Sequence, residues 1–328
     1  MPDGPSSVLQ LRFILPFAIM ASGLTVGYLL KLRLGECGKR STRLTRVGLI
    51  WVDPLNVCLA LWGQEITDVR MAGLPVTGLA IALLASLPAY LWVRSRQVPP
   101  KRAGVLVSTS MFSNLGPTFG TFLCFVLAGE RGFATAALFT IYFYPTFFTL
   151  GLLVGRRYGS DGQQVNAWRY MLDTMKDPAS RNPVLSVFAG LALSFWAPER
   201  PEFLAAVPDV SVPGATFLYL VAIGMTLDLS KVAKYWRHSV GVGLVKFVYT
   251  PAIGLALGWL WVALGPDDPI YLQVIFIQAC MPVAIFALIL ANLFDLSRNM
   301  ANTIWLLTNA FAIVLSPLIL VAARALGQ

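Results

Sequence analysis

Charged residues are scarce in this chain of 328 residues, because Asp, Glu, Lys and Arg together make up only 12% of it. A soluble domain carries about twice that charged fraction. Hydrophobic residues make up 57% of the chain and its mean hydropathy is +0.69, so they cannot all be buried in one water-soluble core. A membrane-spanning helix needs ~20 mostly apolar residues. We therefore predict an all-α polytopic membrane protein that lies in the lipid bilayer.

Residue types that bind metals or carry catalysis are also scarce. The chain has one histidine, His238, and four cysteines without a CxxC spacing, which argues against a metal site and a histidine-based catalytic site. No P-loop sequence is present, and no nucleophile is grouped with a base. The sequence therefore predicts a protein that is not an enzyme, holds no cofactor or metal, and does not hydrolyse ATP.

Ten apolar segments alternate with polar connections, and we expect each to be a transmembrane helix. They lie at about residues 11–32, 45–63, 71–93, 104–128, 133–155, 183–198, 212–229, 238–264, 270–294 and 299–323. The sixth is the shortest of them.

The net charge of +9 has a topological explanation. The connections after the first, third, fifth, seventh and ninth segments hold every Lys and Arg except Arg12, Arg70, Arg131, Arg200, Lys246 and Arg324. Basic residues accumulate on the cytoplasmic side of membrane proteins. We therefore predict a multi-pass protein of a bacterial-type cell membrane with both termini outside, and no nucleic-acid partner.

Prolines recur in a similar pattern in the two halves of the chain. Pro54 and Pro117 lie in the second and fourth segments, and Pro213 and Pro282 lie in the seventh and ninth. Because five segments per half is an odd number, two halves of one fold would be inverted, as in many secondary transporters. The alternative is that prolines are simply common in membrane helices. The predicted units are a first five-helix repeat over 1–155, a cytoplasmic linker over 156–182 and a second repeat over 183–328.

The fourth and ninth segments are predicted to be broken helices that cross. A mid-span proline removes one backbone hydrogen bond and obstructs another, and freed backbone groups need partners in hydrocarbon. Two facing breaks form a site for a small ion or anion, and Ser110, Ser113 and Asn114 have the spacing of one helix face. Proline kinks packed by small residues are the alternative. The candidate substrate-binding residues of these segments are Ser110, Ser113, Asn114, Gly116, Pro117, Thr118, Gln278 and Pro282.

Two charged residues lie well inside the apolar segments. Asp53 stands directly before Pro54 and three residues before Asn56, and Lys246 lies in the eighth segment. Such residues are costly in lipid and by default mark a pathway, a relay or a charge pair. We predict that Asp53, with Asn56, takes part in ion or proton coupling and that Lys246 attracts an anionic substrate or pairs with an acid. A helix-start role for Asp53 and snorkelling of Lys246 are the alternatives.

Several stretches resemble those of a known carrier family. In the first half they are GLIWVDPLNVCLALWG (48–63) and SNLGPTFGTFLCFVLAGERG (113–132). In the second half they are KDPASRNPVLSVFAGLAL (176–193), VPGATFLYLVAIGMTLDLSK (212–231), VKFVYTP (245–251) and IQACMPVAIFALILANLFD (277–295). With these stretches the chain resembles the auxin efflux carrier family, which includes plant PIN carriers and bacterial malonate-type permeases.

The resemblance implies an elevator-type carrier. The first, second, sixth and seventh spans would form a scaffold, often dimeric, so that a homodimer is expected, and the other spans would form a moving transport domain. Asn114, Pro117, Gln278 and Pro282 would fall at the crossing, and Asp53 on the scaffold side facing it.

Two differences from the family's pattern concern the site itself. The family usually has its fourth-span proline a few residues later, near Phe122 in this chain, and Ile285 and Ala287 stand where an asparagine often occurs. The family's substrates are therefore not transferred to this chain. We predict secondary active transport of a small organic anion such as a carboxylate, driven by the membrane potential or by protons. A sodium-coupled symporter of the bile-acid type and a non-transporting membrane sensor with a carrier fold are the alternatives.

Overall fold

The computed structural model describes residues 5–35, 37–63, 71, 73–159, 166–197, 199–226, 232–264 and 268–328. Over these ranges the chain is helical, with one isolated β-bridge and no strand, as the all-α prediction requires.

The helices up to residue 176 are α1 (Pro5–Leu34), α2 (Gly38–Val47), α3 (Asp53–Trp62), α4 (Gly73–Arg96), α5 (Pro100–Met111), α6 (Gly120–Phe139), α7 (Phe143–Thr146), α8 (Leu152–Tyr158) and α9 (Ala167–Lys176). They are followed by α10 (Pro178–Trp196), α11 (Glu202–Ala205), α12 (Val207–Gly224), α13 (Val232–Leu244), α14 (Thr250–Leu264), α15 (Pro269–Ala279), α16 (Ile285–Leu293) and α17 (Arg298–Ala325). Short π-helical or 3₁₀ turns join some of these helices: η1 (Gly48–Val52), η3 (Thr140–Tyr142), η4 (Phe147–Gly151) and η5 (Val245–Tyr249).

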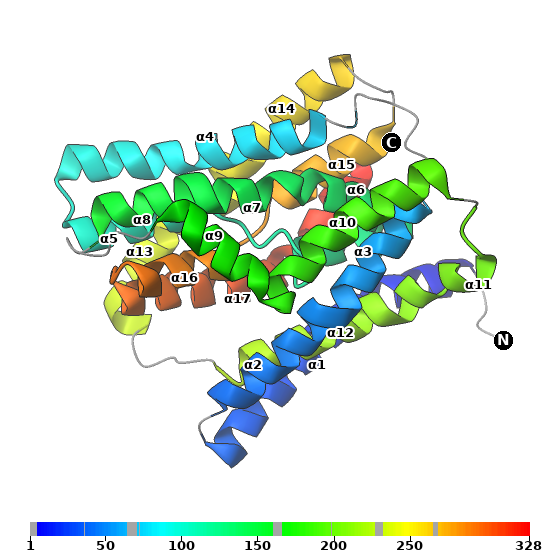
Figure 1. Ribbon diagram of the computed structural model, residues 1–328, viewed down its shortest axis with the longest axis horizontal. Coiled ribbons are helices and arrows are strands. Elements are labelled where there is room, and N and C mark those ends of the chain that lie inside the picture. Colours follow the sequence, from blue (N-terminus) through cyan, green and yellow to red (C-terminus); the bar gives the residue numbers. More distant parts are fainter. Residues whose placement is uncertain are drawn as a thin grey trace.

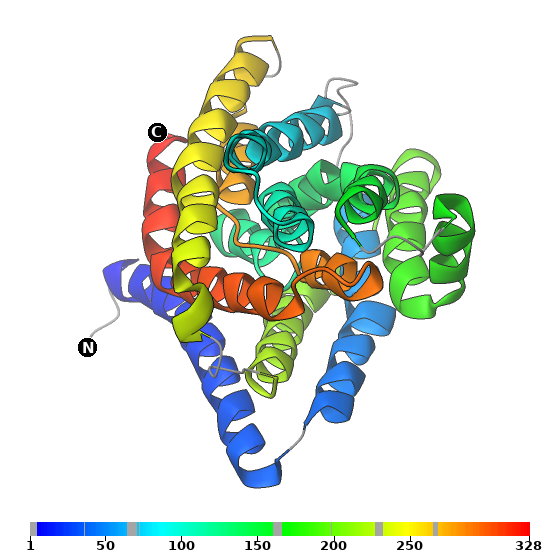
Figure 2. The ribbon, with the colours of Figure 1, turned by 90° about the vertical axis from the view of Figure 1, so that its left-hand side faces the viewer.

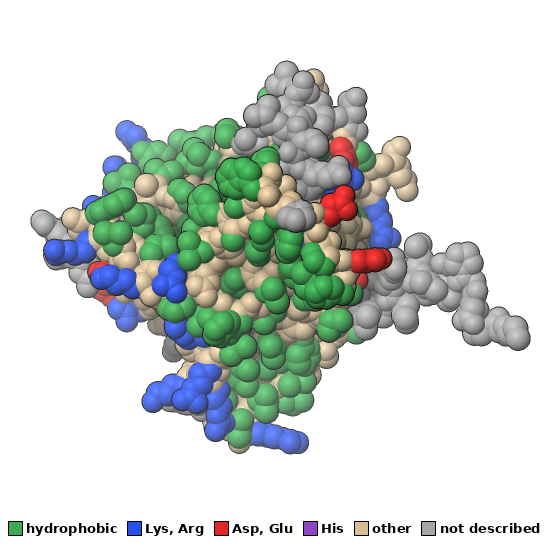
Figure 3. All heavy atoms as spheres, turned by 45° about the vertical axis from the view of Figure 1, so that its right-hand side comes forward, with side chains coloured by type: hydrophobic (Ala, Val, Ile, Leu, Met, Phe, Trp, Pro, Cys, Tyr) green, Lys and Arg blue, Asp and Glu red, His purple; other side chains and the backbone are tan. Residues whose placement is uncertain are grey.

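Among the described residues, six helical stretches are long and apolar enough to cross a membrane, by length and composition. They are Gly38–Trp62, Gly73–Arg96, Gly120–Tyr158, Glu202–Gly224, Val232–Ala263 and Arg298–Ala325. Figure 3 shows hydrophobic side chains over the middle of the molecule, basic side chains mainly toward its left and lower ends, and acidic side chains mainly toward the right. These features are those of a polytopic membrane protein. The count of ten spans and the inverted repeat stay predictions.

Several helix pairs can be followed in Figures 1 and 2. Helix α1 packs along α12 and α3 packs along α10, toward the lower right of Figure 1. Helices α4, α5, α13 and α16 lie toward the left of the same view. The α1–α12 contact depends on Gly27 and Gly224, because a Cβ on Gly27 would overlap the Val221 carbonyl and lie 2.9 Å from the Gly224 Cα. Two facing glycines let helix backbones touch.

A proline inside a helix is accommodated by a wider turn and by a side-chain donor. Pro54 has no N–H with which to bond the Ile50 carbonyl, and the chain forms the π turn η1 directly before Asp53. The side-chain amide of Asn182 on α10 donates to the Ile50 carbonyl at 2.9 Å. The hydrogen bond that Pro54 removes is thus replaced by a contact between η1 and α10.

The predicted linker over 156–182 contains α9 and the start of α10, and its residues 160–165 lie outside the described residues. Asp177 begins α10 by accepting a hydrogen bond from the Ala179 amide at 3.2 Å. The guanidinium of Arg46 donates two hydrogen bonds of 2.8 Å to the Asp177 carboxylate. These bonds hold the pKa of Asp177 below its usual value. The division into two repeats and a linker stays a prediction.

Candidate functional site

The two apolar segments predicted to be broken are interrupted in the structure, and their interruptions meet. The chain is non-helical over 112–119, between α5 and α6, and over 280–284, between α15 and α16. An antiparallel β-bridge joins Ser113 to Val283. In Figure 1 the two connecting traces lie in the middle of the molecule. We call these two stretches the unwound segments.

Backbone hydrogen bonds hold the unwound segments together. The Asn114 amide donates to the Pro282 carbonyl at 2.7 Å, and the Ala284 amide donates to the Phe112 carbonyl at 3.0 Å. Backbone groups without partners are costly in an apolar interior. Each break therefore supplies partners for the groups that the other break releases.

One sequence prediction about this site is wrong. Ser110, Ser113 and Asn114 do not share a helix face, because α5 ends at Met111 and the last two residues lie in the unwound segment. Pro117 explains the difference, since its ring obstructs a helical carbonyl four residues earlier, at Ser113. Leaving the helix brings Ser113 and Asn114 into contact with other elements.

Asn114 belongs to a network of neutral polar groups. Its Nδ2 donates to Asn309 Oδ1 at 3.1 Å, and its Oδ1 accepts from the Thr118 hydroxyl at 2.5 Å. Asn309 lies on α17 and donates to the Val283 carbonyl at 2.9 Å and to the Trp305 carbonyl at 2.8 Å. Asn309 thus contacts both unwound segments. The sequence reasoning missed it, although an amide inside the tenth apolar segment was a usable signal.

Lys246 reaches the unwound segments from η5. Its side chain is fully buried, with 0% of its surface exposed. The Nζ atom donates to the Ser110 carbonyl at 2.7 Å and to the Ser113 hydroxyl at 2.9 Å. No carboxylate of the described residues forms an ion pair with it. Among the described residues, the buried Lys246 amine is therefore hydrogen-bonded to two neutral oxygens and to no carboxylate.

Gln278 lies where the two unwound segments meet, and we call this place the crossing. Its Nε2 donates to the Leu115 carbonyl at 3.2 Å, and its buried Oε1 has no hydrogen-bond partner in the described part of the chain. The buried hydroxyl of Ser110 also lacks a partner there. A Cβ on Gly120 would overlap Gln278 Oε1, whereas a Cβ on Gly116 would meet nothing within 4 Å. The crossing thus holds the buried amine of Lys246 and two polar side-chain groups whose hydrogen-bonding capacity is unused within the described part of the chain.

Asp53 and Asn56, the predicted coupling residues, contact α12 rather than the unwound segments. Asp53 is buried, and its Oδ2 accepts from the Tyr219 hydroxyl at 2.5 Å, while its Oδ1 has no partner among the described residues. Asn56 Oδ1 accepts from the Ser211 hydroxyl at 2.5 Å. Tyr219 and Ser211 are neutral partners that sequence reasoning did not identify.

Helix α12 connects Asp53 to the crossing. The Thr216 hydroxyl donates to the Pro117 carbonyl at 3.1 Å. Thr216 and Tyr219 are three residues apart and share a face of α12. One face of this helix therefore contacts both the carboxylate of Asp53 and the first unwound segment.

Known proteins resemble this chain over most of its length, although no family model matches it. A protein of Methanothermobacter thermautotrophicus named an uncharacterized transporter is 24% identical over 305 residues, which cover 89% of this chain and 92% of the relative. A second, from Methanocaldococcus jannaschii and also named an uncharacterized transporter, is 24% identical over 247 residues, 74% of this chain and 75% of the relative. These similarities support a transport function. They favour a carrier over an enzyme, and neither name states what is carried.

Replacing Asn309 with leucine is expected to destabilise the crossing. The variant loses the bonds to Asn114 and to the Val283 carbonyl, and each buried group left without a partner costs ~1–3 kcal/mol. We expect the free energy of unfolding to fall by about 3 kcal/mol, seen as a lower melting temperature of the purified protein. Asn302→Leu is the matched control, because Asn302 is exposed on the same helix and should tolerate the change. Equal melting temperatures for the two variants would contradict the role of Asn309.

Proposed function

We propose that the protein is a secondary active transporter that moves a small organic anion, such as a carboxylate, and binds it at the unwound segments beside Lys246. The observation that carries this proposal is the fully buried ammonium group of Lys246, which has no carboxylate partner among the described residues. The two archaeal relatives support the transport part of the proposal.

The polar groups at the crossing favour an anion that also carries a hydrogen-bond donor. Burying an ammonium group without a counter-charge costs several kcal/mol, and a bound carboxylate offsets that cost. The unpaired hydroxyl of Ser110 is available to donate to the same carboxylate, whereas Gln278 Oε1 requires a donor from the ligand. A small carboxylate with a hydroxyl or N–H group would satisfy all three.

Transport would follow an elevator-type movement of the crossing against a scaffold that contains α1, α3, α10 and α12. Thr216 of this scaffold bonds the first unwound segment, and α3 and α12 pack against α6, to which an ion pair of the described residues also joins the scaffold. Arg200, between α10 and α11, forms a bidentate pair with Glu130 and donates to the Leu59 carbonyl at 2.7 Å. Both side chains of the pair are largely buried. Such contacts would have to break for the crossing to move.

Asp53→Asn is expected to uncouple transport from the proton gradient. Asparagine keeps an acceptor for the Tyr219 hydroxyl but cannot change its charge. Proton-driven accumulation should fall at least about tenfold, a change that corresponds to a coupling free energy of typical size. Exchange of the same anion across the membrane should persist. Both are measured in proteoliposomes, with Asp209→Asn, exposed on α12, as the control. Undiminished proton-driven accumulation in Asp53→Asn would remove Asp53 from the coupling mechanism.

Counterflow in proteoliposomes tests the transport proposal. Hydroxy, amino and aromatic carboxylates are first ranked by how much they raise the melting temperature, because a ligand of the folded state stabilises it. The best one is then used as the labelled anion. Stabilisation that requires sodium would favour the bile-acid type of symporter. Stabilisation without exchange of label would favour a sensor and overturn the proposal.

The homodimer, the bacterial-type cell membrane and the outward position of both termini stay predictions. The start of α1 and the end of α17 both lie toward the right of Figure 1, which agrees with an even number of crossings. Labelling of cysteines added at the two ends, by a reagent that does not cross the membrane, tests their side.

A further inference from the structure

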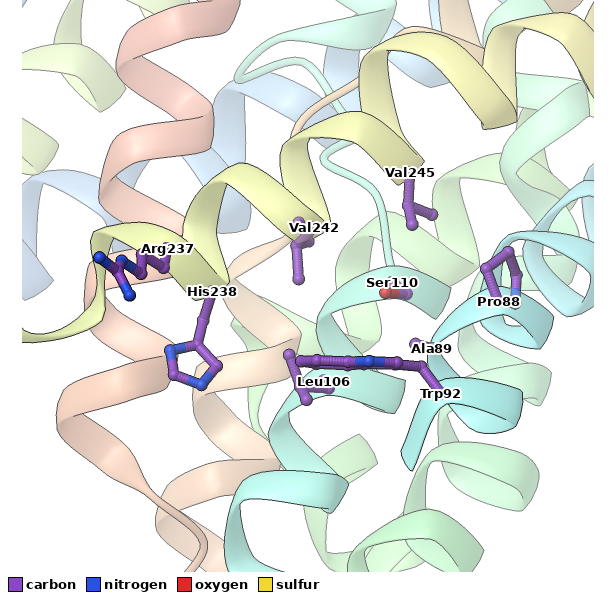
Figure 4. A pocket seen from close by; sticks show the side chains of 10 residues that line it. Pro88, Ala89, Trp92, Leu106, Ser110, Arg237, His238, Val242 and Val245 are labelled. Carbon is purple, nitrogen blue, oxygen red and sulfur yellow. The ribbon is translucent and has the colours of Figure 1, made fainter. Parts of the chain in front are cut away.

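A cavity of about 540 Å³ lies between α4, α5 and α13, beside the crossing. Its walls are mostly apolar and include Trp92, Leu106, Val242 and Val245. Figure 4 shows the Trp92 ring edge-on beside Leu106, with Val242 and Val245 on the facing helical stretch. We call this cavity the α4–α13 groove.

The α4–α13 groove opens between two helix faces that carry exposed apolar side chains. Leu87 and Leu91 are exposed on α4, and Val240 and Leu244 are exposed on α13. In a membrane protein, exposed apolar side chains on spans face lipid. The natural occupant of an apolar groove that opens toward lipid is a hydrocarbon chain.

One end of the groove is basic. Arg237 and His238 line it, and Arg102, at the start of α5, lies close to His238. His238 Nδ1 is buried and has no hydrogen-bond partner among the described residues. Trp92 and Trp236 are about half exposed near this end, and tryptophans of this kind collect at the level of the lipid headgroups. The basic end of the groove therefore has the composition expected at the depth of lipid phosphates.

We propose that the α4–α13 groove binds an anionic phospholipid, with an acyl chain against Trp92 and Val242 and the phosphate at Arg237 and His238. The apolar walls match the chain, and the positive charge and the unpaired His238 nitrogen match the phosphate. The inner wall of the groove includes Ser110, whose carbonyl accepts from Lys246. A lipid bound in the groove thus contacts Ser110, a residue of the crossing. The site requires neither an organic-anion substrate nor turnover.

Quenching of tryptophan fluorescence by brominated lipid tests this site in nanodiscs. The chain has nine tryptophans, so the signal of Trp92 is the difference between the wild type and Trp92→Phe. Quenching of Trp92 by brominated phosphatidylglycerol should be half-saturated at about a fivefold lower mole fraction than quenching by brominated phosphatidylcholine. This ratio is the preference for an anionic lipid that one basic residue gives. Quenching that rises in proportion to mole fraction, equally for both lipids, would show bulk lipid only and overturn the proposal.

Matched variants separate the groove from the rest of the surface. Gly241 lines the groove and has open space around a Cβ, so Gly241→Leu should fill it and abolish the preference for phosphatidylglycerol. Gly243→Leu, on the same helix but outside the groove, should keep that preference. Arg237→Gln should lower it about fivefold, whereas Lys234→Gln should not. An unchanged preference in Gly241→Leu, or relief of quenching by small carboxylates, would overturn the lipid assignment.

Discussion

Lys246→Met is expected to lower the exchange of the transported anion about 100-fold while the protein stays folded. The side chain is fully buried, and methionine is of similar length, so the substitution removes the charge without leaving a large cavity. Removing an unpaired buried charge also removes its desolvation cost. This gain offsets the loss of the hydrogen bonds to the Ser110 carbonyl and the Ser113 hydroxyl, so the melting temperature should stay near that of the wild type. The loss should appear in anion binding and exchange. Counterflow and thermal-shift titration with the same anion measure the two effects.

Two further variants separate the charge of Lys246 from its hydrogen bonds. Its ammonium group also caps the C-terminal end of α5 through the Ser110 carbonyl, where a cation or any donor is favourable. Lys246→Gln keeps a donor for that carbonyl but carries no charge, so we expect it to lose exchange as Lys246→Met does. Lys234→Met, exposed on α13, should exchange normally. Wild-type exchange in Lys246→Gln would show that Lys246 acts only as a cap.

The charged residues of the interior were predictable from the sequence because membrane spans contain so few of them. Lys246 and Asp53 were identified only from the free-energy cost of placing a charged side chain in lipid, and both are buried in the structure. The prolines at 117 and 282 likewise predicted two breaks, since a proline cannot continue a helical hydrogen-bond ladder. Whether these residues carry transport and coupling stays a prediction.

The partners of these residues were not predictable in the same way. Tyr219, Ser211 and Thr216 are neutral, and Ser and Thr hydroxyls in spans usually bond their own helix backbone. The presence of these residues in a span therefore does not predict a partner on another element. Thr216 does both, as it donates to the Val212 carbonyl at 3.0 Å and to the Pro117 carbonyl at 3.1 Å. Which hydroxyl reaches another element depends on how helices pack, and this depends on contacts that a pattern of hydropathy does not specify.

Gly27→Ala is expected to destabilise the protein strongly, although it adds only a methyl group and alanine has a higher helix propensity than glycine. The new Cβ would overlap the backbone carbonyl oxygen of Val221 and lie 2.9 Å from the Gly224 Cα. A flexible side chain could move away, but a helix backbone cannot, so α1 and α12 must separate along their contact. Overpacking of this kind costs typically ~1–3 kcal/mol, and a backbone clash belongs at the upper end, about 3 kcal/mol. Thermal unfolding in detergent should show a melting temperature lower by several degrees.

Gly224→Ala should have a similar effect from the other side of the contact, since its Cβ would overlap the Leu24 carbonyl oxygen. Gly214→Ala, also on α12, is the matched control because a Cβ there meets nothing within 4 Å. It should leave stability unchanged or raise it by up to about 1 kcal/mol, through the higher helix propensity of alanine. The chain has 27 glycines, and the sequence alone does not distinguish these two from Gly214. If all three variants unfold at the wild-type temperature, α1 and α12 do not pack backbone to backbone.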